Sequence, residues 1–225
     1  MMTPRQQVLA SIRRSLGVTG EEGTRRMEVD RRLSEAPKGL VPTRGHRPPE
    51  ERVRLFREMA EGVQASVDEV ADPRDVPAAI SAYLRNHNLP QRLRRGADTR
   101  LAGLPWADTP LDVSEGPSDG SDEVAVSHAS GGVAETGTLV MVSGPENPST
   151  LNFLPDTHVV VVDAREIAGD YEAVWDRLRA RYGKGLLPRT VNWITGPSRS
   201  GDIEQTILLG AHGPRRLHIL VVGKP

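Results

Sequence analysis

Two glycine-rich turns carry residue types from which a small-molecule site could be built. The first is Gly131-Gly132-Val133-Ala134-Glu135-Thr136-Gly137-Thr138, followed closely by Ser143-Gly144-Pro145. The second is Thr195-Gly196-Pro197-Ser198-Arg199-Ser200-Gly201-Asp202-Ile203-Glu204. Glycine lets backbone N–H groups approach a ligand closely, and serine and threonine add short hydroxyl donors. Two such turns on one sheet would form a polar pocket for a small anion.

Glu135 and His212 are the acid–base candidates of these segments. A partly desolvated glutamate in a glycine-rich connection can act as a base or nucleophile. The alternative for Glu135 is a surface carboxylate that accepts hydrogen bonds from nearby amides. His212, in Ala211-His212-Gly213-Pro214, and His128, just ahead of the first turn, are each either acid–base groups, ligands or structural residues.

The remaining candidates are hydrogen-bond donors and glycines that would surround the ligand. Arg199 could hold a carboxylate or phosphate through two parallel hydrogen bonds. The alternative for the segment after Ser143 is a loop stabilised by its own side chains. The predicted ligand-binding residues are Gly131, Gly132, Thr136, Gly137, Thr138, Ser143, Ser198, Arg199 and Ser200.

We expect no metal or cofactor to be bound by this chain. The sequence contains neither H-x-x-x-H nor H-E-x-x-H, the spacings that place two histidines on one helix face. Asp202 and Glu204 are weak metal candidates, and otherwise they complement the dipole of a helix that we expect at 201–209. There is no cysteine, so thiolate-held iron–sulfur clusters and disulfides are excluded.

Composition narrows the classes of partner. The chain has 225 residues, and its 29 basic and 30 acidic residues give a net charge of −1, which does not favour nucleic acid. No stretch reaches the ~18 apolar residues that a membrane span needs, and the N-terminus lacks an apolar signal region. The expected location is the cytoplasm.

Local patterns predict an α/β domain over 50–225, preceded by a helix and a polar linker over 1–49. Apolar spacing predicts a helix at 5–16, which docks either on its own domain or on a partner. Residues 17–50 are rich in glycine, proline and charge, as in a linker. Apolar periodicity predicts two more helices, at 51–69 and from about Val76 to Asn86.

After residue 98, short β-type runs alternate with turns and helices. Four consecutive valines, Val159 to Val162, indicate a strand that is buried on both faces, as in a sheet covered by helices on each side. The order of elements predicts a mixed but mostly parallel sheet. The second turn should then lie beyond the carboxyl end of its strand, where such sheets bind ligands. Strands are expected at 123–127, 138–143, 157–163, 190–195 and 217–222, with helices at 164–182 and 201–209.

Several motifs in a fixed order resemble the lactate utilisation (LUD) domain family. They are Gly132 to Thr138, Ser143-Gly144-Pro145, Leu154-Pro155, His158 to Val161, Thr195 to Glu204 and Gly210 to Pro214. The resemblance implies a three-layer α/β/α sandwich like that of ribose-5-phosphate isomerase and the CoA-transferases. It also implies a place in a three-component system that oxidises L-lactate to pyruvate, whose other two components carry iron–sulfur clusters.

Three functions stay open at this point. The first is a non-redox component of an L-lactate utilisation system, which binds a small carboxylate or organises iron–sulfur partner subunits. The second is a free-standing enzyme of the isomerase or CoA-transferase type, acting on a small phosphorylated or thioester substrate with Glu135 as base or nucleophile. The third is a structural partner that binds no ligand.

Overall fold

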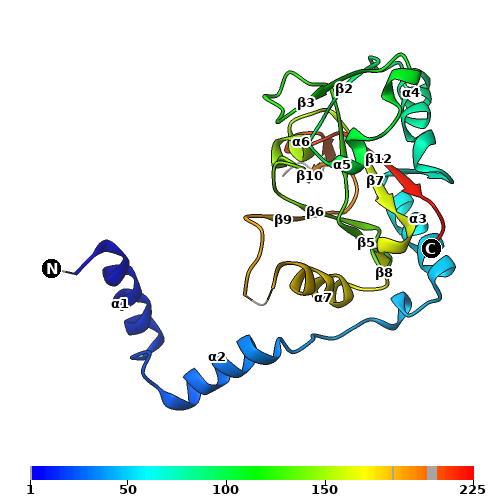
Figure 1. Cartoon of the computed structure of the whole chain (residues 1–225). Coiled ribbons are helices and arrows are strands. Elements are labelled where there is room, and N and C mark those ends of the chain that lie inside the picture. The colour runs from blue at the N-terminus through cyan, green and yellow to red at the C-terminus, as the bar shows by residue number, and fades with distance from the viewer. Residues whose placement is uncertain (1, 184, 202–206) are drawn as a thin grey trace. The chain divides into compact units, whose positions relative to one another are not determined.

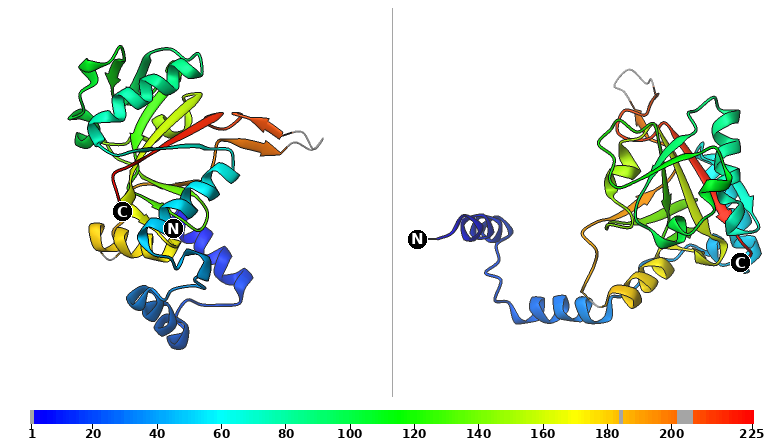
Figure 2. Two further views of the ribbon diagram at one scale, coloured as in Figure 1. Left: turned by 90° about the vertical axis from the view of Figure 1, so that its right-hand side faces the viewer. Right: turned by 45° about the horizontal axis from the view of Figure 1, so that its top comes forward.

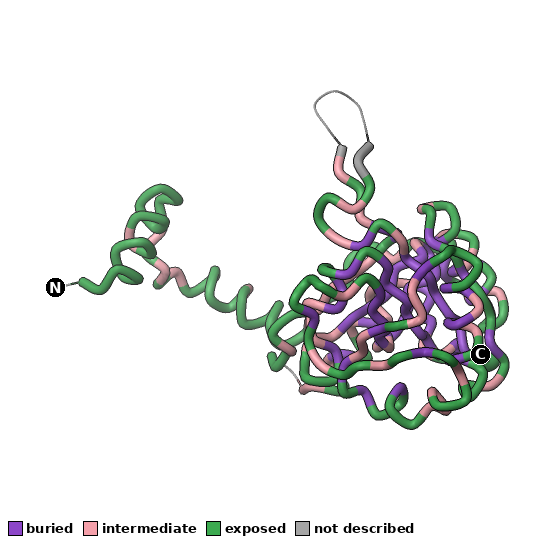
Figure 3. The backbone as a smooth tube through the Cα atoms, turned by 90° about the horizontal axis from the view of Figure 1, so that it is seen from above, coloured by how far each residue is buried: buried purple, intermediate pink, exposed green. Residues whose placement is uncertain are grey.

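The computed structural model describes residues 2–183, 185–201 and 207–225, which form two compact units, Met1–Leu40 and Val41–Pro225. The first unit contains α1 (Pro4–Leu16) and α2 (Gly23–Glu35) (Figure 1). The helix expected at 5–16 is present, and it begins with a capping box between Thr3 and Gln6. Neither helix contains a buried residue, as Figure 3 shows by colour.

The helix α2 corrects the expectation of a continuous linker over 17–50. Its apolar content is low, so apolar periodicity does not indicate it. Ion pairs at helical spacing stabilise it instead: Arg31 contacts Glu28 at 2.9 Å and Glu35 at 2.7 Å, and Arg32 contacts Glu28 at 2.9 Å.

The second unit is built on a six-stranded sheet in which all neighbouring strands are parallel, in the order β1-β12-β7-β4-β2-β3. All four valines of the predicted central strand are buried, as their run indicated. The strands are β1 (Ser66–Val70), β2 (Arg92–Arg95), β3 (Asp112–Glu115), β4 (Val124–His128), β7 (Thr157–Asp163) and β12 (Arg216–Val222).

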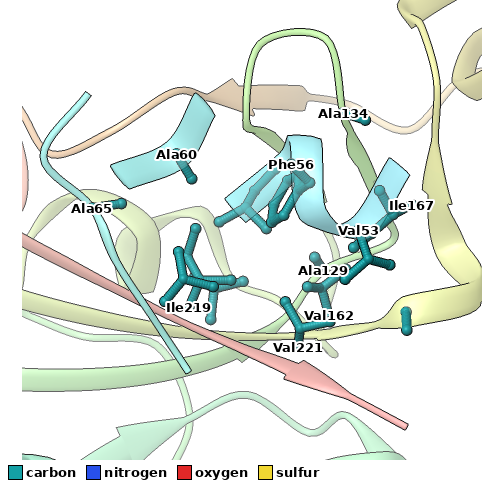
Figure 4. Close-up of a cluster of buried hydrophobic side chains, with 14 of the residues drawn as sticks. Val53, Phe56, Ala60, Ala65, Ala129, Ala134, Val162, Ile167, Ile219 and Val221 are labelled. Carbon is teal, nitrogen blue, oxygen red and sulfur yellow. The ribbon is translucent and has the colours of Figure 1, made fainter. Parts of the chain in front are cut away.

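Helices cover both faces of this sheet. On one face, α4 (Val76–Asn86) and α5 (Thr99–Ala102) pack against alternate residues of β7 and β12. On the other face, α3 (Pro49–Gly62) inserts the fully buried Phe56 among the remaining residues of the same strands (Figure 4). The alternation follows from the pleat, which points successive side chains to opposite faces.

A second, four-stranded sheet lies against α3 and is covered by α7 (Tyr171–Tyr182). Its order is β8-β5-β6-β9, with β5–β8 parallel and the other two pairs antiparallel. The expected three-layer α/β sandwich with a mostly parallel central sheet is confirmed. The strands of the second sheet are β5 (Gly131–Val133), β6 (Thr138–Val142), β8 (Ile167–Ala168) and β9 (Val191–Ile194).

Sheet membership corrects the expected position of the second turn. The strand before it, β9, pairs antiparallel with β6 in the second sheet and not with the parallel strands. The two strands expected at 123–127 and 138–143 likewise belong to different sheets. The second turn therefore does not follow a strand of the parallel sheet.

Three helix predictions also need correction. The helix expected at 51–69 ends at Gly62, and β1 takes up Ser66–Val70. The helix expected at 164–182 begins only at Tyr171, after a 3-10 turn at Ala164–Glu166 and β8. The described residues of the helix expected at 201–209 are strand instead, because β10 (Arg199–Gly201) and β11 (Ile207–Leu209) pair antiparallel (Figure 2). Asp202 and Glu204 lie outside the described residues.

Over the described ranges, no helix combines the length and apolarity needed to cross a membrane. The same ranges contain no group of three or more histidine and acidic side chains arranged to hold a metal ion.

Candidate functional site

The second glycine turn meets the Ala211-His212-Gly213-Pro214 segment around Ser198. The Ser198 backbone N–H donates to the Pro214 carbonyl at 2.8 Å, and the Ser198 carbonyl accepts from the Gly210 N–H at 3.0 Å. The Ser198 hydroxyl oxygen accepts from the His212 backbone N–H at 3.3 Å. Two predicted site residues from separate motifs, Ser198 and His212, are thus held next to each other.

These two segments form the wall of a small cavity of about 90 Å³. That volume is roughly three times the ~30 Å³ that one water occupies in the liquid, so it suits a molecule of few non-hydrogen atoms. The short helix α6 (Ser149–Phe153) and the amino ends of β7 and β12 complete it. Its lining residues are Asn152, Phe153, His158, Ile194, Gly196, Pro197, Ser198, His212, Gly213, Pro214 and Leu217. We call it the Asn152 cavity.

The two most buried polar residues of the lining, Asn152 and His158, carry polar atoms without hydrogen-bond partners among the described residues. Asn152 is only 1% exposed, yet neither its Oδ1 nor its Nδ2 has a hydrogen-bond partner in the described part of the chain. His158 is fully buried, with Nε2 at 3.0 Å from the Ser127 hydroxyl and Nδ1 unpartnered. Buried polar groups are normally paired, because an unpaired one costs about 1–3 kcal/mol. These atoms therefore indicate a place where a ligand or ordered water completes the structure.

The charge state of His158 follows from its surroundings. Burial lowers its pKa from 6.5 to about 3, since the cationic ring would lose its hydration. The imidazole is therefore neutral near neutral pH and offers one donor and one acceptor. Together with the Asn152 carboxamide, it makes the most buried part of the lining polar but uncharged.

Gly196 is the residue that lets the second turn approach the rest of the fold. Its φ is +75°, in the left-handed region that favours glycine, and an added Cβ would lie 2.5 Å from the Val63 carbonyl oxygen. The guanidinium of the neighbouring Arg199 donates to the same Val63 carbonyl oxygen. In this structure Arg199 therefore fixes the turn to the end of α3. Ser200 lies on β10.

The hydroxyls of the first turn are occupied by one another. The Thr138 hydroxyl lies 2.7 Å from that of Thr136, 2.7 Å from that of Thr195 and 2.9 Å from the Tyr171 hydroxyl. These hydroxyls join the two glycine turns through hydrogen bonds within the protein. Gly137 has a φ of +66°, and an added Cβ would lie 2.3 Å from the Ala60 nitrogen. At Gly132, an added Cβ would lie close to the side chains of Phe56 and Ile167.

Glu135 is 3% exposed, so the alternative of a surface carboxylate is wrong. Its Oε2 has no hydrogen-bond partner and lies 4.0 Å from the Arg44 Nε. Its backbone N–H donates to the Gly169 carbonyl at 3.2 Å. Glu135 does not line the Asn152 cavity. Gly131 belongs to β5, where it pairs with Val140.

Ser143 lies at a different cavity, described below. Its hydroxyl oxygen accepts from the Thr190 backbone N–H at 2.9 Å. Of the residues predicted from sequence, the structure brings Ser198 and His212 together in the Asn152 cavity and places Ser143 elsewhere.

Sequence reasoning missed Asn152 and His158. Asn152 interrupts the apolar run from Leu151 to Leu154, and His158 directly precedes the run from Val159 to Val162. A polar residue within a run that must be buried is the available signal, because burial without a partner is costly.

Comparison with known proteins shows which family part of the chain resembles. Residues 120–222 match the family model of the LUD domain. Lactate utilization protein C of Geobacillus sp. (strain WCH70) is 36% identical over 91 residues, which are 40% of this chain and 38% of that protein. The Bacillus subtilis protein of the same name is 33% identical over 91 residues, with the same coverage of 40% and 38%. An uncharacterized protein of Neisseria meningitidis serogroup B is 38% identical over 101 residues, 44% of this chain and 42% of that protein.

These matches span about two fifths of the length of the curated relatives. A solved structure of a DUF162 family protein from Deinococcus radiodurans superimposes with a TM-score of 0.60 at 22% identity, covering 79% of this chain and 99% of that one. The likeness supports the fold alone. Residues 120–222 are therefore similar to the LUD domain family, and the chain is similar to lactate utilization protein C.

Proposed function

We propose that this protein takes part in lactate utilization by binding a small 2-hydroxy or 2-keto acid, such as lactate or pyruvate, in the Asn152 cavity. The observation that carries the proposal is the unpartnered carboxamide of Asn152, 1% exposed, at the wall of a cavity of about 90 Å³. The names of the relatives support the metabolic role.

Polarity changes along the cavity in a way that fits such an acid. The most buried polar groups, Asn152 and His158, are uncharged and suit a hydroxyl or keto oxygen. Ser198 is half-buried and His212 is exposed, so the mouth reaches solvent. A carboxylate bound at this mouth keeps part of its hydration, whereas burying it beside Asn152 would be costly without a cation.

The walls of the cavity suit the methyl group of a three-carbon acid. Phe153, Ile194 and Leu217 supply apolar surface to the lining. Binding pockets of this kind combine apolar walls with a few placed polar groups.

The chain contributes no thiolate ligand, since it has no cysteine. We therefore assign electron transfer in lactate oxidation to separate iron–sulfur partner subunits, and to this chain the binding of the acid. A free-standing enzyme with Glu135 as its base or nucleophile is less well supported, because Glu135 does not line the Asn152 cavity.

Calorimetry with L-lactate and with pyruvate on the full chain tests the ligand. Asn152→Leu keeps the approximate shape of the side chain and removes both hydrogen-bonding atoms. We expect it to weaken binding at least about tenfold, equivalent to ~1.4 kcal/mol, and to raise the free energy of unfolding, since two unpaired buried groups disappear. Asn86→Leu, at an exposed position, is the matched control.

Binding of neither acid at millimolar concentration, or equal binding by wild type and Asn152→Leu, would exclude the Asn152 cavity as the site. The metabolic role has a separate test. A Bacillus subtilis strain without its own lactate utilization protein C should regain growth on L-lactate when it carries this chain, and no rescue at matched expression would count against the role.

A further inference from the structure

The carboxyl edge of the parallel sheet carries three copies of one local motif, Asp-x-Arg. They are Asp72-Pro73-Arg74 after β1, Asp98-Thr99-Arg100 after β2 and Asp163-Ala164-Arg165 at the end of β7. In each, the aspartate accepts a hydrogen bond from the backbone N–H of the arginine and pairs with its guanidinium. The motif therefore presents an oriented guanidinium at the edge where α/β sheets bind ligands.

The motif at Asp98 differs from the other two in its surroundings. Asp98 is 3% exposed, and it holds Arg100 through Nε at 3.0 Å and Nη2 at 2.6 Å. The side chain of Arg100 is 46% exposed, against 80% for Arg74 and 74% for Arg165. Asp98 binds only part of the Arg100 guanidinium, and Arg100 lines a cavity.

This cavity has a volume of about 260 Å³ and is separate from the Asn152 cavity. It lies at the carboxyl ends of β2 and β4, beside the loop after β6 and the end of α7. Its charged members are Asp98, Arg100, Glu146 and Arg181, which balance in formal charge. The full lining is Asp98, Arg100, His128, Ser130, Val142, Ser143, Gly144, Pro145, Glu146, Asn147, Arg181 and Tyr182.

Two hydrogen-bond acceptors on residues that line this cavity have no partner among the residues that the structure describes. The Nδ1 of His128 lies 2.9 Å from the Ala129 carbonyl oxygen, which can only accept, so Nδ1 carries the proton. Burial lowers the pKa of His128, so the ring is neutral near neutral pH and its Nε2 is an acceptor. Asn147 is 5% exposed and donates from Nδ2 to the Val142 carbonyl at 3.2 Å, while its Oδ1 is unpartnered.

We propose that this cavity is a second binding site, for a polyhydroxylated organic anion such as a sugar acid or a sugar phosphate. Arg100 binds the anionic group, while His128 Nε2 and Asn147 Oδ1 accept hydrogen bonds from hydroxyls. Ser130 and Ser143 contribute further hydroxyls. The volume equals roughly nine waters at ~30 Å³ each, which suits a six-carbon ligand and exceeds what a three-carbon acid would fill.

Calorimetry with gluconate, glucose 6-phosphate, glucose and inorganic phosphate tests the site. We expect gluconate or glucose 6-phosphate to bind at least tenfold more tightly than glucose or phosphate, since only these ligands combine an anion with hydroxyls. The stronger of the two identifies whether the natural anion is a carboxylate or a phosphate.

Variants connect the binding to these residues. His128→Asn keeps an N–H in place of Nδ1 and removes the Nε2 acceptor, and Arg100→Gln removes the cation. Each should weaken the tighter ligand at least tenfold, whereas Arg74→Gln, from the same motif at another strand end, should leave it unchanged.

Thermal unfolding shows which variants are folded. If Arg100→Gln does not fold, His128→Asn still tests the proposal. Equal affinity for all four ligands, no binding of either hydroxylated anion, or wild-type affinity in folded His128→Asn would each overturn the proposal. The lactate experiment with Asn152→Leu is independent of these results.

Discussion

Two fully buried histidines should make this fold sensitive to mild acid. His158 on β7 and His218 on β12 are 0% and 1% exposed. Burial lowers the pKa of His158 from 6.5 to about 3 and that of His218 from 6.5 to about 4. For His218, Asp68 opposes this shift and His87 adds to it.

The direction and size of the effect follow from proton linkage. Between the folded and the ordinary pKa, the unfolded chain binds a proton at each histidine and the native chain does not. Stability is therefore greatest above about pH 6.5 and falls as the pH is lowered toward the folded values. Each histidine should remove about 1.4 kcal/mol per pH unit, or about 2 kcal/mol between about pH 7.5 and pH 5.

The two histidines together account for about 4 kcal/mol over that interval. Domains of ordinary stability unfold with about 5–15 kcal/mol, so the loss should be large. Carboxylates with lowered pKa, such as Asp98 and Asp163, titrate at lower pH and contribute little above about pH 5.

Urea unfolding followed by tryptophan fluorescence, repeated across this pH range, measures the slope. His158→Gln keeps a nitrogen near Nε2 for the Ser127 hydroxyl, and His218→Asn keeps one near Nδ1 for the Ser66 hydroxyl at 2.9 Å. Each variant should reduce the slope of the free energy of unfolding by about 1.4 kcal/mol per pH unit. His46→Gln, at an exposed histidine, should leave it unchanged.

The reasoning is refuted if the wild-type slope corresponds to less than one proton, or if neither variant changes it. Either result would mean that the native chain protonates these rings as readily as the unfolded chain does.

The glycine turns and the Arg199 contact make two further predictions. Gly137→Ala places a Cβ 2.3 Å from the Ala60 nitrogen at a φ of +66°, so it should lower the free energy of unfolding in urea by at least about 2 kcal/mol. The control is Gly144→Ala, because no atom lies within 4 Å of a Cβ at that position. Equal losses of stability in the two variants would contradict the steric argument. Arg199→Gln removes a hydrogen bond to the Val63 carbonyl, so it should lower the free energy of unfolding by about 1 kcal/mol in the same assay and leave the affinity for lactate unchanged. A tenfold fall in lactate affinity by calorimetry would instead place Arg199 in the ligand site.

Elements with a strong local signal could be predicted from sequence. Val159 to Val162 marked β7 because only a strand buried on both faces tolerates such a run. The apolar spacing located α1 and α4. The sheet that contains β9 could not be predicted, because strand pairing depends on residues distant in the chain. For the same reason a helix was predicted at 201–209, where the described residues belong to the paired strands β10 and β11.

The candidate site also contains residues that could be predicted from the sequence and residues that could not. Ser198 and His212 could be found because their motifs combine glycines with polar side chains. Asn152 could not, because an asparagine beside leucine and phenylalanine is equally compatible with a loop facing solvent. Its importance comes from its 1% exposure and its missing partners, which are properties of the folded chain.

The two proposed sites lie at opposite ends of the parallel strands, and this bears on how they can interact. His158 and Leu217, the second residues of β7 and β12, line the Asn152 cavity at the amino ends. The other cavity lies at the carboxyl ends, where β4 finishes with His128. His128 of β4 lines the second cavity, and its neighbour Ser127 hydrogen-bonds His158, which lines the Asn152 cavity. The two cavities share no lining residue, so their occupants do not compete for the same side chains, and the position of β4 is one route by which one occupant could affect the other.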